Sequence, residues 1–533
     1  MAWSNSILLA TAVDGSSYGT LSLLPPVVAI VLAIVTKRVT ISLLAGIFIG
    51  ALLVASGNPF SAVATTLETH LWASLSNADH LRVFVFTLLM GAMVGVMQQS
   101  GGMAAIVKGI APLARTRCGG QLTVWLLGLI VFFDDYANSL LLGNTMRPVT
   151  DRLRISREKL AYLVDSTAAP VSGLALVSTW VATEIGLVQA GLATTVLAET
   201  ADAFSIFVAT IPYRFYVLWA LLFVPLVALL GRDFSAMLRA ERNAIAAPEA
   251  PNRSPAADDR GMHWANAVIP VAAVVVVTVG LIVLTGQNAL AEKDVTDASI
   301  MNIFGNGDSY LALVYGSLTG LLLAMLLANL VTRLGWQAIR EAAAKGAQQV
   351  GGALVILWLA WALSGLTDLK YLGTGQYLGE LLQSSLDVRL MPTVVFVLAS
   401  AVAFSTGTSW GTMGILMPLV VPTVVSMLAA NSASVSPENP ILVASIGSVL
   451  AGAIFGDHCS PISDTTVLSS QASGCNHVAH VRTQLPYALS VGAVSIICGT
   501  LPVGFGVPVW FLLPAGVAAL VILLLAIGRR VDE

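Results

Sequence analysis

Four short polar stretches interrupt apolar sequence, and each is rich in the oxygen ligands that a hard cation prefers. They read FDDYANS at 133–139, VDST at 164–167, STGTSWGT at 405–412 and GDHCSPISDTT at 456–466. Their carboxylate, hydroxyl, amide and carbonyl oxygens come with few large apolar side chains. A site built from such groups suits a small cation such as Na⁺ at least as well as a metabolite.

Six acidic residues in apolar surroundings are the first candidates for chemistry: Asp134, Asp135, Asp165, Glu184, Asp457 and Asp464. A carboxylate at the centre of a membrane costs about 2.5 to 3.5 kcal/mol on insertion scales, so its presence there indicates a function. A proton and a Na⁺ ion would compete for one such group, and alternate exposure of that group to each side suffices for antiport.

We expect Asp135 and Asp165 to carry this exchange, with Asp457 and Asp464 next in order. Na⁺ is predicted at Asp135, Asp165 and Asp457, and His458 can modulate the site because imidazole titrates near neutral pH. The hydroxyl groups beside these acids complete the predicted site: Ser166, Thr167 and Thr465. No Lys or Arg is expected inside the membrane to bind an organic carboxylate.

The composition indicates a membrane protein, so transmembrane helices must position these polar groups. The 533 residues are 56% hydrophobic and 10% charged, against about 25% charged in soluble domains. A bilayer core needs about 20 apolar residues per helix, and this rule predicts an all-α polytopic protein with about 11 transmembrane helices. The predicted spans are 21–36, 39–56, 81–99, 160–186, 214–231, 264–286, 309–332, 350–367, 441–470, 484–503 and 507–528.

The basic residues predict the orientation of these spans. If the N-terminus is periplasmic and the C-terminus cytoplasmic, 21 of the 26 Lys and Arg residues lie on the cytoplasmic side, as the positive-inside rule requires. The five outside are Arg82, Arg214, Lys293, Lys370 and Arg389. A net charge of −3 gives no indication of a nucleic-acid partner; the lipid bilayer is the expected one.

The two halves of the chain resemble each other with opposite orientation. Residues 1–231 form a predicted first repeat, with a re-entrant hairpin at about 119–146 and a broken helix at about 160–186. Residues 264–503 form a second repeat, with a hairpin at about 390–430 and a broken helix at about 441–470. A cytoplasmic linker, 232–263, joins them, and 504–533 adds a C-terminal helix. Inverted repeats with broken helices are typical of secondary transporters.

Proline is expected to help open each broken helix. Pro170 lies in DSTAAPVS and Pro461 in GDHCSPIS, and a proline removes one internal hydrogen bond. The carbonyls freed where a helix unwinds can coordinate a cation.

At FFDDYANSLLLGNTMRPVTDRL, DSTAAPVSGLALVSTW and GDHCSPISDTTVLSS the sequence resembles the NhaC-type Na⁺/H⁺ antiporter family of the ion transporter superfamily. The resemblance implies a scaffold domain, a transport domain holding both hairpins and both broken helices, a homodimer and elevator-type alternating access. By motif position it implies a site lined by Asp134, Asp135, Asn138, Asp165, Thr406, Thr408, Ser409, Asp457, Ser460 and Asp464.

The leading hypothesis is therefore a secondary transporter of the bacterial inner membrane that exchanges cytoplasmic Na⁺ for external H⁺, with no cofactor beyond these ions. The alternative on the same fold is a Na⁺-coupled transporter of an amino acid or small organic acid, bound by the hairpin Ser, Thr and Asn residues. An enzyme is disfavoured because no nucleophile and base pair, and no closed metal site, can be recognised.

Overall fold

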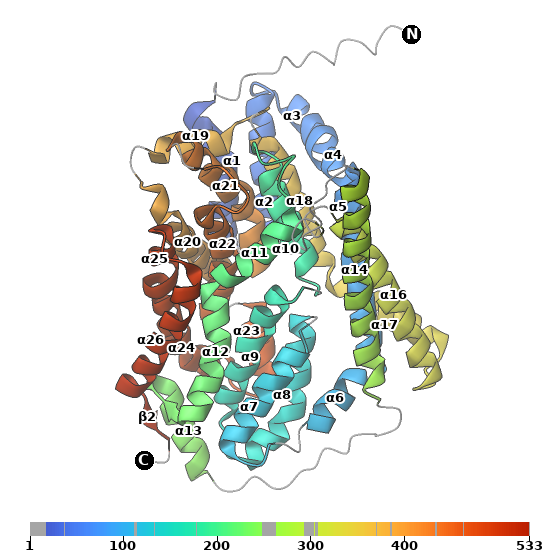
Figure 1. Ribbon diagram of the computed structural model, residues 1–533, viewed down its shortest axis with the longest axis vertical. Coiled ribbons are helices and arrows are strands. Elements are labelled where there is room, and N and C mark those ends of the chain that lie inside the picture. Colours follow the sequence, from blue (N-terminus) through green and yellow to red (C-terminus); the bar gives the residue numbers. More distant parts are fainter. Residues whose placement is uncertain are drawn as a thin grey trace.

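Helices make up nearly all of the described chain (Figure 1). The computed structural model describes residues 18–36, 38–110, 114–132, 134–176, 178–247, 263–292, 303, 307–368, 370–383, 386–431, 434–461 and 463–531. The predicted N-terminal segment before residue 18 and the part of the predicted linker from 248 to 262 lie outside these residues.

The elements before the central linker are η2 (Gly19–Leu23), α1 (Leu24–Thr36), α2 (Val39–Val54), α3 (Pro59–Thr65), η3 (Thr66–Trp72), α4 (Ala73–Ser76), α5 (Ala78–Gln99), α6 (Gly102–Ile110), α7 (Arg117–Ile130), α8 (Asp135–Arg152), α9 (Arg157–Leu174), α10 (Val181–Leu192), α11 (Ala203–Thr210), η5 (Ile211–Tyr213), α12 (Phe215–Leu230), β1 (Arg232–Asp233) and α13 (Ser235–Ala246). Those after it are α14 (Ala265–Glu292), α16 (Ser309–Leu330), α17 (Trp336–Gln349), α18 (Gly351–Thr367), α19 (Thr374–Gln383), η6 (Val388–Leu390), α20 (Met391–Thr406), α21 (Ser409–Ala430), α22 (Pro440–Cys459), α23 (Asp464–Ser473), α24 (His477–Ser495), η7 (Ile496–Thr500), α25 (Leu501–Gly504), α26 (Val509–Ile527) and β2 (Arg529–Arg530).

The length and apolar character of the helices confirm the predicted all-α polytopic membrane protein. Nine helices of the described residues are long and apolar enough to cross a membrane, or up to 11 if each of two bent pairs counts as one span. One pair joins Thr40–Val54 to Pro59–Ser76 with a bend of 119°, and the other joins Ala203–Tyr213 to Phe215–Leu230 with a bend of 48°.

Helices α7 and α8 fold back on each other as a helical hairpin. The first residue of α7, Arg117, donates to the carbonyl of Arg154 just beyond the end of α8. At the other end of the hairpin, the Asn138 amide donates to the carbonyls of Gly128 (2.9 Å) and Val131 (3.0 Å). These bonds satisfy backbone groups that the end of α7 leaves unpaired. The tip therefore presents Asp134 and Asp135 at the start of α8.

Helices α20 and α21 form a second helical hairpin with a tight tip. Gly407 has φ 70°, a left-handed conformation that favours glycine, and Thr408 caps α21 by accepting a hydrogen bond from the Gly411 N–H at 3.3 Å. Each of these helices is long enough to cross a membrane.

Helix α20 lies alongside α22, and both run in the same direction. Gly452 of α22 faces the backbone of Phe396, and Gly456 faces the backbone of Ser400, so the missing side chains let the two helices approach closely. The helices end together, because the Ser460 hydroxyl donates to the carbonyl of Phe404 at 2.8 Å. The tip of the second hairpin is thereby fixed beside the end of α22.

Two helices are interrupted at the centre of the molecule. Helix α22 ends at Cys459 and the chain resumes as α23 at Asp464, with Ser463 at the N-cap. Helix α9 continues through Pro170 as far as Leu174, and the chain resumes as α10 at Val181. Pro170 does not open the gap that the sequence suggested, because a buried helix can tolerate one missing hydrogen bond when its neighbours pack around it.

A separate group of helices, α5, α14, α16 and α17, packs along one side of the molecule (right in Figure 1). Helices α5 and α17 touch through glycines: Gly91 and Gly95 face the backbone around Gly346. Such small residues are typical of close helix contacts in membranes.

The first part of the predicted linker is folded against the helix ends. Strand β1 pairs with β2 in antiparallel register, Arg232 opposite Arg530 and Asp233 opposite Arg529. Helix α13 follows, and its Glu241 is fully buried. Residues 232–246 of the predicted linker are therefore folded into β1 and α13.

Candidate functional site

Asp165, at the middle of α9, is fully buried and is the most heavily bonded of the predicted acids. Its carboxylate accepts hydrogen bonds from Gln484 Nε2 (2.5 Å), Thr466 Oγ1 (3.1 Å) and Ser469 Oγ (3.3 Å). His480 Nε2 lies 3.4 Å away. All of these partners lie on helices α23 and α24, which pack against α9.

Asp457 occupies the last turn of α22, where the helix is interrupted. Its Oδ2 accepts from Thr465 Oγ1 at 2.8 Å, and its backbone carbonyl lies 3.5 Å from the Thr466 hydroxyl, which also contacts Asp165. Thr466 therefore links the two acids. Their carboxylates are close enough to repel each other, as are those of Asp457 and Asp135.

The tip of the first hairpin brings Asp134 and Asp135 to the interruption after α9. Both are buried, and Thr179 in the interruption donates to Asp134 Oδ2 at 3.2 Å. Trp180 lies against Asp135. Asn138, also predicted for the site, uses its amide N–H groups on backbone carbonyls, including that of Thr167 at 3.4 Å. Its position holds the hairpin tip to α9.

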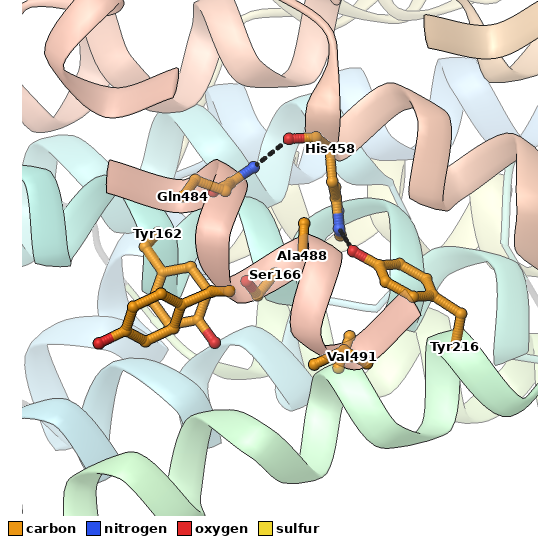
Figure 2. A pocket seen from close by; sticks show the side chains of 9 residues that line it. Tyr162, Ser166, Tyr216, His458, Gln484, Ala488 and Val491 are labelled. Atoms are coloured by element: carbon orange, nitrogen blue, oxygen red, sulfur yellow. Dashed lines mark hydrogen bonds between the residues drawn. The ribbon is translucent and has the colours of Figure 1, made fainter. Parts of the chain in front are cut away.

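Two of the predicted hydroxyl residues donate hydrogen bonds within their own helices, and two others are buried near the candidate site. Thr167 and Thr406 donate to carbonyls of their own helices, Leu163 at 2.9 Å and Val402 at 2.8 Å. Ser166 is buried beside the pocket shown in Figure 2. Ser409 is buried as well, at the start of α21. Each of these oxygens keeps lone pairs with which it can accept or coordinate.

Asp464 lies at the rim of the candidate site. It is exposed at the first residue of α23 and accepts from the hydroxyl of Tyr136 at 3.3 Å. This contact joins α23 to the first hairpin, and a carboxylate in the first turn of a helix is stabilised by the helix dipole.

His458 faces a small pocket next to Asp165. Figure 2 shows Gln484 donating to the His458 carbonyl (3.0 Å) and the Tyr216 hydroxyl bonded to His458 Nδ1 (2.9 Å). Tyr162, Tyr487 and Val491 complete much of the lining. The pocket is polar at the Gln484 and His458 end, and Gln484 connects it directly to Asp165.

Several residues that contact the predicted acids were not found from the sequence. Gln484 and His480 are four residues apart on α24, so they share one face of that helix, and this spacing was a signal that could have identified them. Thr466 is the last residue of the predicted polar stretch at 456–466 but was not assigned to the site, and Ser469 lies three residues beyond it on α23. Their approach to Asp165 depends on how α23 packs against α9, which no local pattern shows.

Two cations of the described residues are buried in the protein interior, and each is paired with an acid. Arg214 is fully buried and bonds Glu184 at 2.7 Å, and Lys159 is fully buried and pairs with Asp233. Arg214 lies at the bend between η5 and α12. Its predicted place on the outer side of the membrane stays a prediction.

The acids do not form a closed metal cage. In residues 18–531, leaving out the segments that the structure does not describe, no three His, Cys, Asp or Glu side chains gather as a metal site would require. None of the Lys or Arg residues described pairs with Asp135, Asp165 or Asp457. The site is thus a set of linked carboxylates among hydroxyl, amide and carbonyl oxygens.

A polytopic helical protein whose interrupted helices and hairpin tips surround buried carboxylates has the architecture of a secondary transporter. The chain belongs to the Na⁺/H⁺ antiporter family, whose model matches residues 171–501. It is 34% identical over 513 residues to an uncharacterized protein of Haemophilus influenzae, with 96% of this chain and 95% of the relative covered.

Two further proteins are similar to part of the chain. The malate-2H⁺/Na⁺-lactate antiporter of Bacillus subtilis is 33% identical over 29% of this chain and 28% of its own. The YdaH transporter of Alcanivorax borkumensis has a similar fold, with a TM-score of 0.57 at 17% identity, over 83% of this chain and 89% of that one.

Proposed function

We propose that the protein exchanges cytoplasmic Na⁺ for external H⁺. The observation that carries this proposal is that Asp135, Asp165 and Asp457 are buried among hydroxyl and amide groups, with no Lys or Arg of the described segments paired to them. A buried carboxylate must be neutralised or paired. A Na⁺ ion and a proton can each do so, and they compete for the same oxygens.

In this proposal Na⁺ takes its ligands from one or two carboxylates together with hydroxyl and carbonyl oxygens. Asp165 and Asp457 are the acids of one part of the site, with Thr465, Thr466 and the carbonyls freed by the interruption of α22 near them. Asp134 and Asp135 at the tip of the first hairpin form the other part. His458 would tune the site through Gln484, and Asp464 would act at its rim.

Exchange requires that the site open to each side of the membrane in turn. We expect the two hairpins and the two interrupted helices to move together as a transport domain against a scaffold, as elevator-type access and the inverted-repeat hypothesis require. We also expect a homodimer in the bacterial inner membrane, with the N-terminus periplasmic and the C-terminus cytoplasmic. The buried contacts between α9, α23 and α24 support joint movement of these helices.

The experiment measures Na⁺-driven dissipation of a preset proton gradient in everted vesicles or proteoliposomes. Wild type should release the gradient when Na⁺ is added, and Asp165→Asn should abolish the response because it removes the charge on which both ions depend. Asp387→Asn, a substitution at a half-exposed carboxylate in the cap of η6, is the matched control and should respond as wild type. Normal exchange by Asp165→Asn would refute the assignment.

The second candidate is a Na⁺-coupled transporter of an amino acid or small organic acid. It is favoured by the similarity to an antiporter of malate and lactate in one segment of the chain. In this case Ser409, Thr408 and Asn138 would bind the solute. Uptake of labelled malate, lactate or amino acids that requires Na⁺, together with no response to Na⁺ alone in the proton assay, would favour this function.

A further inference from the structure

Arg214 touches both halves of the interrupted helix α9 to α10. Its Nη1 donates to the carbonyl of Gly173, one residue before the end of α9, at 2.5 Å. The same nitrogen donates to Glu184 Oε2, in the first turn of α10, at 2.7 Å. Residues of α11 hold the guanidinium in place. Its Nε donates to Thr210 Oγ1 at 3.0 Å, and the group lies 4.7 Å from the centre of the Phe207 ring.

The interruption between these two halves contacts both hairpins. Ser178 fixes its shape, because the hydroxyl donates to the Ser172 carbonyl (2.7 Å) and accepts from the Trp180 N–H (3.1 Å). Thr179 then reaches Asp134 of the first hairpin, and the Trp180 ring lies 4.7 Å from that of Trp410 in the second hairpin. A change in the spacing of the two helix ends would therefore move partners of both hairpin tips.

Arg214 is suited to set this spacing. Its planar guanidinium can donate to two acceptors in a fixed geometry, which the single ammonium of lysine cannot reproduce. The Gly173 carbonyl is one of the last four of α9 and has no partner within a regular helix. Glu184 neutralises the cation, and both side chains are fully buried. The pair is thus anchored on a third element and joins the two half-helices.

We propose that Arg214 and Glu184 are positioning residues that hold the α9 to α10 interruption in the geometry that presents Thr179 and Trp180 to the hairpin tips. They do not touch the ion; they act through the backbone at Gly173 and through residues 178–180. This proposal rests on the proposed function for its transport assay. It gives a role to Glu184, one of the six acidic residues that the sequence singles out, and to Arg214, which the predicted site does not include.

The test uses purified full-length protein in proteoliposomes and measures the Na⁺ dependence of exchange. The double variant Arg214→Met with Glu184→Gln removes the pair without leaving a buried unpaired charge. We expect its apparent KM for Na⁺ to rise by about tenfold or more, since misplacement of about 1 Å can cost up to about a hundredfold. Arg214→Lys keeps the charge, so it should restore thermal stability while the KM stays raised.

A matched double variant separates positioning from a merely structural role. Lys159→Met with Asp233→Asn removes a second buried ion pair of the described residues, which joins the start of α9 to β1, at the opposite end of α9 from the interruption. It should lower thermal stability without changing the apparent KM for Na⁺. If the Arg214 variants likewise lower only the thermal stability and leave the apparent KM for Na⁺ unchanged, the proposal is overturned.

A second readout is independent of the transported ion. Leu176 lies in the interruption and is 45% exposed, so Leu176→Cys, with the four native cysteines replaced by serine, reports its opening to a soluble maleimide in detergent. Loss of the Arg214 pair should speed modification by about tenfold, as expected for one lost hydrogen bond to a charged group, and the Lys159 control should not. An unchanged rate of maleimide modification overturns the positioning proposal. If wild type shows no Na⁺-driven exchange in proteoliposomes, only the proposed Na⁺/H⁺ exchange is refuted.

Discussion

Replacing Gly456 by alanine should separate the two helices that carry Asp457 and the tip of the second hairpin. A Cβ at this position would lie 2.3 Å from the Ser400 carbonyl oxygen, 2.7 Å from Ala403 Cβ and 2.8 Å from the Phe404 N–H nitrogen. Two of the three atoms belong to the backbone of α20, which cannot rotate away. Restoring ordinary contact of about 3.4 Å requires the helices to part by about 1 Å.

The magnitude of the effect follows from this displacement. Overpacking of an interior costs about 1 to 3 kcal/mol, and the better helix propensity of alanine returns up to about 1 kcal/mol, so we expect a net loss of about 1 to 2 kcal/mol. Transport should suffer more, because Asp457 follows Gly456 directly and a shift of about 1 Å at a site can lower its efficiency by up to about a hundredfold. Thermal unfolding and the Na⁺ dependence of exchange measure the two effects.

Gly280 provides the control. It lies in α14, and a Cβ built there meets nothing within 4 Å among the residues described. Gly280→Ala should therefore leave exchange unchanged and stabilise the protein slightly. If Gly456→Ala matches Gly280→Ala in both measurements, the close contact of α20 with α22 does not control the geometry of Asp457, and the reasoning fails.

Two further outcomes are expected. Na⁺ should raise the apparent Tm of wild type above its value in choline, because Na⁺ at a hundred times its Kd adds about 2.7 kcal/mol to the free energy of unfolding. Asp457→Asn should lose this increase in Tm. If the variant kept the increase, the ion would bind elsewhere. Burial raises the pKa of Glu241 above its ordinary value, although Lys159 and Arg117 act in the opposite sense. Its contribution to stability is then full below its ordinary pKa of 4.5 and is lost as the pH rises through the raised pKa. Between acid and neutral pH, the Tm of Glu241→Gln should therefore fall less than that of wild type. Parallel Tm profiles would contradict this.

The sequence predicted the fold class because composition and span length decide it. An apolar chain of this length with few charges has to cross the membrane many times, and the structure agrees. The end of α22 also has a local cause, since Ser460 and Pro461 follow Asp457 in a stretch with few apolar side chains. In α9 the same residue types occur at Asp165 to Ser172, yet the helix continues. It ends only at Leu174, next to the Gly173 carbonyl that Arg214 bonds.

The partners of Asp165 could not be predicted because they come from distant parts of the chain. Gln484 and Thr466 lie about 300 residues away in sequence, and only the packing of α23 and α24 against α9 brings them near. The ion pair of Arg214 with Glu184 could not be predicted for a related reason, since the two residues lie on different elements and only the fold brings them together.

The short pairing of β1 with β2 has a consequence for biosynthesis. Arg232 and its partner Arg530 are separated by about 300 residues, so at about 5 to 20 residues per second the ribosome completes β2 roughly 15 to 60 s after β1. Throughout that interval the nascent chain must leave β1 without its partner strand, while every later helix is inserted. This pairing can therefore form only after all the helices between the two strands have been made.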